Sequence, residues 1–146
     1  MSRASTLLGV LLLGAVTVSA ASGGPATAAE ALAAVRHEST VRITTTGRKS
    51  GKPHTVPVWF AVDGDRVLLS TLDPSRDWVL NALHTPAVRL DFGSVVVEGR
   101  LRPVTDPALA ERITAALRQK YWVAWLAGLV GKGPAATYVI DDVRVP

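Results

Sequence analysis

The hairpin signal in the middle of the chain most strongly limits the fold. A β-branched and aromatic run, residues 55–62, leads into Asp63-Gly64-Asp65, and a second run of the same kind follows at residues 66–71. An Asp-Gly pair between two such runs is the strongest short-range indication of a tight β-hairpin. A tight hairpin joins antiparallel neighbours only, whereas parallel strands need a long crossover. The sequence therefore predicts an antiparallel sheet.

The remaining segments extend this pattern. Further strands are expected at residues 40–46, 87–92, 95–104 and 137–145, and helices at residues 28–38, from Asp73-Pro74-Ser75 to before Pro86, and from Asp106-Pro107 onward, with an apolar segment at 121–130. About six strands and two or three helices without βαβ alternation indicate a mainly β (α+β) protein. We expect a small antiparallel β-barrel with short helices at its rim.

The N-terminal residues read as a separate segment. Arg3 precedes an apolar stretch, residues 7–18, and small residues at two cleavage-type sites follow, Val18-Ser19-Ala20 and Ala26-Thr27-Ala28. This order is typical of a secretory signal peptide or N-terminal hydrophobic leader. The apolar stretch is shorter than the ~20 residues of a spanning helix, which disfavours a permanent anchor. We expect a leader over residues 1–28, one domain over residues 29–146, and a protein that is exported or membrane-associated, on the cytoplasmic face if the segment is retained.

Composition excludes several kinds of site. The chain has no cysteine, so it holds neither disulfides nor thiolate metal sites. Its histidines, His37, His54 and His84, show no metal-ligand spacing, and we expect no metal centre. A net charge of +4 favours anionic partners. Because the cations gather at one turn and form no stripe with exposed aromatic residues, nucleic acid is not an expected partner.

The cations gather at residues 47–52, "GRKSGK". This is no phosphate-binding P-loop, because only three residues separate the glycines and Pro53 follows the lysine where a serine or threonine is required. Arg48, Lys49 and Lys52, with Ser50, nevertheless supply charged and neutral donors in a turn whose glycines allow amide N–H groups to converge. Such an array suits a phosphate or carboxylate. The alternative is a solvated basic hairpin.

The residues after the turn favour a binding site. Pro57 cannot donate to a β-ladder, so its strand is an edge strand or carries a break there. A break leaves backbone groups free for a planar, amide-bearing ring, and Trp59 offers an aromatic wall on the same face. We expect the side chains of the following strand and helix start to face the same cavity, namely Ser70, Arg76 and Trp78.

Three motifs together are distinctive: "TGRKSG", "VPVW" and "DWVLN". In this combination the chain resembles the deazaflavin-dependent nitroreductase and quinone reductase family. These proteins are split β-barrels related to the flavin-binding pyridoxamine 5'-phosphate oxidase-like proteins. The resemblance covers residues 40–104 well and extends more loosely to the C-terminus. It implies a hydride-transfer enzyme that uses reduced coenzyme F420, a 5-deazaflavin with a ribityl phosphate and an acidic tail.

The resemblance also implies roles for individual residues. Positions near the cofactor phosphate are matched by Lys49, Ser50 and Gly51, and Arg76 stands where the family places a phosphate-binding cation. Positions beside the deazaflavin ring are matched by Pro57 and Trp59, and Ser70 lies near the reacting face. The family's helix-start positions are matched by Trp78 and Asn81. His54 departs from the family, which often has arginine there. With Arg48 and Lys52 from the turn, these residues form the expected cofactor site.

The expected reaction needs few chemical groups from the protein. The cofactor carries the hydride chemistry, while the protein orients it and encloses the acceptor, a quinone, nitroaromatic or enone. Ser70 and Tyr121 are the catalytic candidates, with Tyr121 or water as the proton source. Tyr121, Trp122 and Trp125 fall where relatives have aromatic substrate-pocket residues. The two tryptophans are also compatible with a core or a membrane-surface anchor.

Two other functions stay open at this stage. The first is an oxidoreductase of the same fold with FMN in place of the deazaflavin, because the phosphate contacts would be much alike. The second is a non-catalytic module that binds the cofactor or an anionic lipid, because a chain exported unfolded would leave a cytoplasmic cofactor behind. A homodimer is compatible with an exposed strand edge at Pro57.

Overall fold

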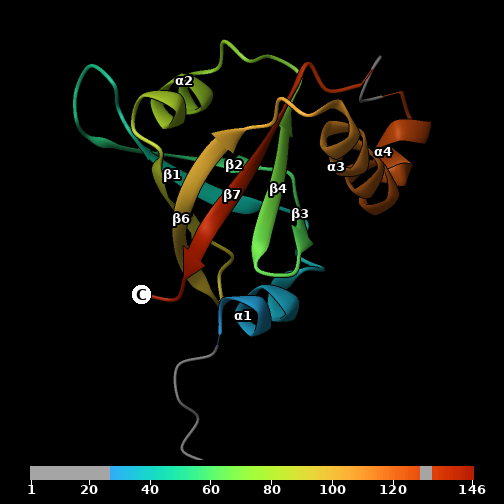
Figure 1. The fold of residues 1–146 in the computed structure, drawn as a ribbon, viewed down its shortest axis with the longest axis horizontal. Helices are drawn as coiled ribbons and strands as arrows, with labels where there is room; N and C mark the ends of the chain where they lie inside the picture. Colours follow the sequence, from blue (N-terminus) through green and yellow to red (C-terminus); the bar gives the residue numbers. More distant parts are fainter. Residues whose placement is uncertain (1–26, 129–132) are drawn as a thin grey trace, which may run out of the picture.

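The computed structural model describes residues 27–128 and 133–146. They form one antiparallel sheet of seven strands in the order β2-β1-β5-β6-β7-β4-β3. The sheet curls into a split barrel with short helices around it (Figure 1). The elements are α1 (Ala28–Val35), β1 (Val41–Thr46), β2 (Pro53–Val58), β3 (Phe60–Asp63), β4 (Arg66–Thr71), α2 (Asp77–His84), β5 (Ala87–Asp91), β6 (Val96–Pro103), α3 (Pro107–Lys120), α4 (Trp122–Leu126) and β7 (Ala136–Arg144). The predicted fold class is confirmed.

The predicted hairpin is the β3–β4 pair. Asp63 stands opposite Arg66, so the turn itself consists of Gly64 and Asp65. Gly64 has a φ of 61°, which the first central residue of a tight hairpin turn requires and glycine adopts without strain. Arg66 Nη2 lies 2.6 Å from Asp63 Oδ2 and closes the turn with an ion pair.

The predicted strand over residues 55–62 is two strands, which explains why there are seven and not six. β2 pairs only with β1, and β3 pairs only with β4, so the two are the opposite edges of the sheet. Trp59 alone connects them. Pro57 lies in the edge strand β2, where a missing N–H donor costs least. The chain therefore crosses from one sheet edge to the other at Trp59 and closes the barrel covalently.

Two apolar clusters hold the barrel together. The larger fills its interior and contains Phe60, Leu69, Leu90 and Ile140, all without exposed surface. The smaller lies between α3 and the outer face of β3, β4 and β7, where Ile113 and Leu117 of α3 meet Ala61, Leu68 and Val139. Burial of each such large side chain contributes about 1.5–3 kcal/mol. The sheet near Trp59 is thus supported on both faces.

The start of α2 differs from the prediction. Asp73 and Ser75 do not cap the helix, because it begins at Asp77 and its N-cap, Arg76, makes no side-chain cap. The Asp73 carboxylate instead accepts hydrogen bonds from the backbone N–H (2.9 Å) and hydroxyl of Ser75. This local turn uses up the capping group before the helix starts. The end before Pro86 is confirmed.

The predicted leader over residues 1–28 lies almost wholly outside the described residues. The first described helix, α1, begins at Ala28 with a capping box formed by Thr27 and Glu30. Across residues 27–128 and 133–146, every helix is too short or too polar to cross a membrane.

Candidate functional site

The basic loop between β1 and β2 is fastened to α2 by Arg48. The Arg48 backbone N–H and its Nη1 both donate to Asn81 Oδ1, at 3.1 and 2.9 Å. Nη1 also lies 3.0 Å from Asp77 Oδ1. Asn81 is only 3% exposed, and its Nδ2 lies 3.5 Å from Thr45 Oγ1. Arg48 and Asn81 were both expected to contact the cofactor. In the structure they contact each other, and this contact fixes the position of the loop.

Most backbone amides of the loop are used within the protein. Gly47 N–H donates to the Lys52 carbonyl and Gly51 N–H to the Gly47 carbonyl, each at 2.8 Å. Lys52 N–H donates to Ser50 Oγ at 3.2 Å. The expected convergence of amides on one anion is thus largely replaced by internal hydrogen bonds. Gly51 has a φ of 70°, so this compact loop needs glycine there.

The exposed side chains of the loop are what can reach a ligand. Lys49, Ser50, Lys52 and His54 all face solvent at the same end of β2. Ser50 Oγ lies 3.4 Å from His54 Nε2. Arg76 is exposed too, and its neighbour in sequence, Asp77, is the residue that pairs with Arg48. Arg76 Nε lies 4.0 Å from Asp73 Oδ2, whereas Lys49 and Lys52 form no ion pair with another described residue. The two lysines, with the Ser50 hydroxyl, are a donor set that suits phosphate or carboxylate oxygens.

Trp59 marks the other end of β2. Its ring stacks on Tyr121 with the centroids 4.4 Å apart and an angle of 6° between the planes. Although Tyr121 covers one face of its ring, Trp59 remains 38% exposed, so part of the ring is available to a flat ligand. Pro57 is exposed two residues earlier in the same strand. Pro57 and Trp59, which were predicted to bind the ring, therefore lie on the outer surface of the segment that closes the barrel.

Ser70 is brought to this end of the barrel by strand register. The β3–β4 ladder ends where Phe60 stands opposite Leu69, so Trp59 and Ser70 are the residues just beyond it. Trp78 takes a different position, packing edge-on against Tyr138 at 6.1 Å beside the barrel interior. The structure thus gathers Pro57, Trp59, Ser70 and Tyr121 at one end of β2, and the basic loop with Arg76 at the other.

The Tyr121 hydroxyl is occupied by the main chain. It accepts from Phe60 N–H at 3.1 Å, and it lies 2.8 Å from the Ser39 carbonyl and 3.1 Å from the Phe60 carbonyl, to which it can donate. Burial raises the pKa of Tyr121, and the hydrogen bond from Phe60 opposes this. Because the hydroxyl satisfies the free edge of β3, its clearest role is to hold Trp59 and α4 in place.

We expect Tyr121→Phe to lower the free energy of unfolding by about 1–3 kcal/mol, because the partly buried groups of Phe60 lose their partner. Urea denaturation of parent and variant measures this. Thr114→Val, which removes a hydroxyl that donates to the Ala110 carbonyl within α3, is the control and should change stability by less. Equal stabilities for Tyr121→Phe and the parent would contradict the structural role.

Lys120 is a residue that the sequence analysis missed. Its Nζ lies 3.4 Å from the centroid of the Phe60 ring and 5.3 Å from that of Tyr121, and it is buried without a hydrogen-bond partner among the described residues. Burial lowers the pKa of Lys120 to about 8, while the charge of Glu38 acts in the opposite direction. The helical spacing of α3 gave no signal, because a lysine in the last helical turn is usually solvated.

This lysine predicts a pH dependence of stability. Between about pH 8 and 10 the unfolded chain holds the Lys120 proton and the folded chain releases it, so the free energy of unfolding rises with pH. Above pH 10 the raised pKa values of Tyr121 and Tyr138 act in the opposite direction. Chemical denaturation from pH 7 to 10 should show a rise of about 1 kcal/mol or more in the parent. The rise should be absent in Lys120→Met. An equal rise in the parent and the variant would contradict the assignment of this pH dependence to Lys120.

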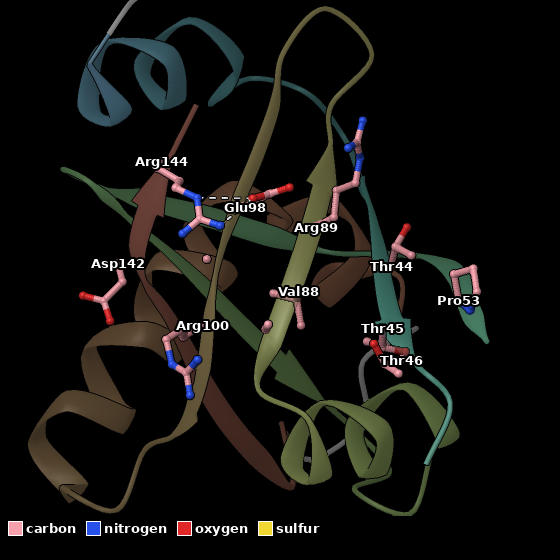
Figure 2. A pocket seen from close by; sticks show the side chains of 12 residues that line it. Thr44, Thr45, Thr46, Pro53, Val88, Arg89, Glu98, Arg100, Asp142 and Arg144 are labelled. Atoms are coloured by element: carbon pink, nitrogen blue, oxygen red, sulfur yellow. Dashed lines mark hydrogen bonds and ion pairs between the residues drawn. The ribbon is translucent and has the colours of Figure 1, made fainter. Parts of the chain in front are cut away.

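A shallow groove of about 380 Å³ starts at the root of the basic loop (Figure 2). Thr46 and Pro53, which flank the loop, line one end of it. The groove crosses the outer face of the sheet past Arg89 to Arg100 and the Arg144–Glu98 pair, whose Nη2 and Oε2 atoms are 2.8 Å apart. Arg89 and Arg100 make no ion pair with another described residue. The lining also includes Asp142, so three arginines face two acidic residues and the groove, which continues from the loop, is only weakly basic.

Within the described residues no three histidine, aspartate or glutamate side chains lie close enough together to hold a metal ion.

The comparisons with known proteins agree with this architecture. The family model described as pyridoxamine 5'-phosphate oxidase matches residues 27–144, which is most of the chain. The chain belongs to the pyridoxamine 5'-phosphate oxidase family.

Solved structures of family-like proteins share the fold. An F420-H2 dependent reductase, FDR-A, matches with a TM-score of 0.57 at 18% identity, over 70% of this chain and 94% of that one. A FAD-binding protein from Mesorhizobium loti gives 0.54 at 16% identity, over 82% and 94%. A protein described as a domain-swapped dimer gives 0.57 at 21% identity, over 70% and 80%. At these identities the matches show the split-barrel fold.

The residues present fit a flavin-type cofactor of this family. The exposed lysines Lys49 and Lys52 and the hydroxyl of Ser50 suit its phosphate, and the exposed part of Trp59 suits its ring. β2 separates the two groups by six residues, about 20 Å at 3.3 Å per residue. A ligand that contacts both ends must therefore be elongated, as a flat ring with a phosphorylated chain is.

Proposed function

We propose that this protein is an oxidoreductase that transfers a hydride from reduced coenzyme F420 to a small organic acceptor of the quinone, nitroaromatic or enone type. The observation that carries the proposal is the arrangement along the edge strand β2. Free cations stand at its first residue, and a partly exposed aromatic platform stands just after its last. An elongated, anionic, flat redox cofactor fits this arrangement.

The chain's own residues bind and orient. Lys49, Lys52 and Ser50 hold the phosphate, and Arg76 adds a cation from the start of α2. Trp59, backed by Tyr121, supports one face of the ring, and Pro57 leaves the strand edge beside it without an N–H donor. Arg48 and Asn81 act indirectly by fixing the loop to α2.

The reacting end of the site contains few polar groups. When bound, the cofactor supplies the hydride. Ser70, at the end of the β3–β4 ladder, is the hydroxyl we place closest to the reacting face. Since the Tyr121 hydroxyl is engaged by Ser39 and Phe60, we infer that the proton for the product comes from water.

The weakly basic groove gives the cofactor's acidic tail a path. It begins beside the phosphate-binding lysines at Thr46 and Pro53 and leads to Arg89 and Arg100 (Figure 2). Carboxylates bound in this groove would contact guanidinium groups at a partly exposed surface. Such contacts contribute modestly to the binding free energy and weaken with salt.

Steady-state turnover tests the proposal. Oxidation of reduced F420 is followed by absorbance with a quinone or a nitroaromatic compound as acceptor. We expect consumption that is proportional to the protein and that falls in Trp59→Ala, because the ring loses its support. Absence of turnover above background with every acceptor, despite tight cofactor binding, would favour a non-catalytic binding protein.

The alternative cofactor is FMN. The fold similarity to a FAD-binding protein favours testing it, and the exposed lysines would serve its phosphate equally well. FMN, however, has no acidic tail to occupy the groove. A chain that binds FMN at least as tightly as F420, and turns over with it, would replace the deazaflavin in this proposal.

A further inference from the structure

The short helix α4 exposes three large apolar side chains, Trp122, Val123 and Leu126, here called the α4 patch. Their exposed fractions are 58%, 61% and 78%. Positions three and four apart share a helix face, so Leu126 lies beside both other residues. The other large exposed apolar residues of the described chain lie in three different segments of the sequence: Trp59, Leu72 and Leu83. The α4 patch is therefore a concentrated apolar surface.

Its neighbour Trp125 behaves differently. This ring is only partly exposed, and the Arg118 guanidinium lies 4.7 Å from its centroid. The cation–π contact ties α4 to the last turns of α3. The α4 patch is thus presented outward on a helix whose other side is attached to the protein.

The α4 patch belongs to a basic stretch of the sequence. Between Glu111 and Asp141 the sequence contains no acidic residue. The last turn of α3 carries Arg118 and Lys120, and Arg112 is exposed further back on the same helix. The Lys120 ammonium is buried and is influenced by Glu38, so the exposed cations of this helix are Arg112 and Arg118. An apolar surface with exposed guanidinium groups on the adjoining helix complements a surface that is apolar inside and anionic at its boundary, as a bilayer with acidic lipids is.

Two further features point to the same partner. Tryptophan is the residue that prefers the headgroup level of a bilayer, and Trp122 is the most exposed tryptophan of the described chain. The apolar residues 7–18 are joined to the domain by residues 19–26, eight residues that can span up to about 28 Å. A leader retained in a membrane would therefore hold the domain near its surface.

We propose that the α4 patch is a membrane-binding surface that inserts into the headgroup region of bilayers containing anionic lipid. Trp122, Val123 and Leu126 enter the interface, and Arg112 and Arg118 face the lipid phosphates. Tyr121 directly precedes the α4 patch and stacks on Trp59, so binding brings the ring end of the candidate site to the membrane. An apolar acceptor dissolved in the bilayer would reach the site from there. The binding itself requires no cofactor.

Tryptophan fluorescence of the full chain with vesicles tests the insertion. The vesicles contain phosphatidylcholine and phosphatidylglycerol with brominated acyl chains, which quench a tryptophan only in close contact. We expect quenching in the parent chain, and Trp122→Phe should remove at least half of it. Trp78→Phe is the matched control, because Trp78 packs against Tyr138, and its loss should leave the absolute quenched emission unchanged.

Co-sedimentation with the same vesicles measures affinity. Leu126→Ser should weaken binding at least fivefold, since burial of a leucine side chain is worth a factor of ten or more. Leu83→Ser removes an equally large, exposed side chain from α2 and should have little effect. Omission of phosphatidylglycerol, or 0.5 M salt, should weaken binding of the parent because the cations lose their partners.

Two results would overturn the proposal. The full chain could bind vesicles through its N-terminal residues alone, with unquenched tryptophans and no effect of Leu126→Ser. Alternatively, analytical ultracentrifugation could show a dimer that Leu126→Ser dissociates, with no vesicle binding, and a second copy would then cover the α4 patch.

Discussion

Replacement of Asn81 by alanine is expected to lower the free energy of unfolding by about 2–3 kcal/mol, because a buried hydrogen-bond acceptor of a charged group is lost. Asn81 Oδ1 accepts from both the backbone N–H and Nη1 of Arg48. Without it the backbone N–H has no partner, and the pair with the exposed Asp77 is too weak to hold the loop alone. The loop should therefore move more freely, and cofactor affinity should fall as well.

Asn81→Asp is the matched control for this change. It keeps an acceptor oxygen opposite Arg48, so we expect unfolding free energy within about 1 kcal/mol of the parent. Urea denaturation measures stability, and fluorescence titration with F420 measures affinity. A loss of stability in Asn81→Ala without any loss of affinity would show that the loop's position is unimportant for binding. Unchanged stability would contradict the anchoring itself.

Replacement of Lys49 and Lys52 together by alanine is expected to weaken cofactor binding at least tenfold, about 1.4 kcal/mol. Both side chains face solvent and belong to no ion pair with another described residue, so the folded domain does not need them. Their loss removes two charge-assisted donors from the candidate phosphate site. The difference should shrink with added salt, because exposed charges are screened.

The control variant loses the same net charge as the double lysine variant, but at positions outside the basic loop. Arg36→Ala with Arg112→Ala removes two exposed cations, one from the C-cap of α1 and one from α3. If long-range attraction alone were responsible, the two double variants would weaken binding alike at low ionic strength. If the lysines contact the ligand, only Lys49→Ala with Lys52→Ala loses the tenfold. Parent-like affinity in low salt would refute the role of the loop.

Local signals predicted much of the fold. The Asp63-Gly64 turn, the alternating strands and the Asp106 cap with Pro107 each act over a few residues, and each is found. The division of residues 55–62 at Trp59 was only partly foreseen. Pro57 indicated an edge or a break, but which strand pairs with which depends on the closure of the whole sheet. The start of α2 was missed because Asp73 bonds Ser75 instead of the helix.

The sequence predicted which residues belong to the candidate site better than it predicted how they are arranged. The cationic turn and Trp59 stand where a ligand can reach them, as the sequence suggested. The engagement of Arg48 by Asn81 and of Tyr121 by Phe60 depends on contacts over 33 and 61 residues, which no local pattern reveals. The same applies to Lys120, whose burial follows from the packing of α3 on Phe60.

Fluorescence titration of the chain with coenzyme F420, and in parallel with FMN, tests the central claim most directly. Tryptophan emission reports on the site, because Trp59 lies at its ring end and is partly exposed. We expect saturable quenching by F420, tighter than by FMN, and a smaller signal change in Trp59→Phe. Unchanged emission with both cofactors up to high micromolar concentration, for a chain that is folded, would contradict a cofactor site along β2.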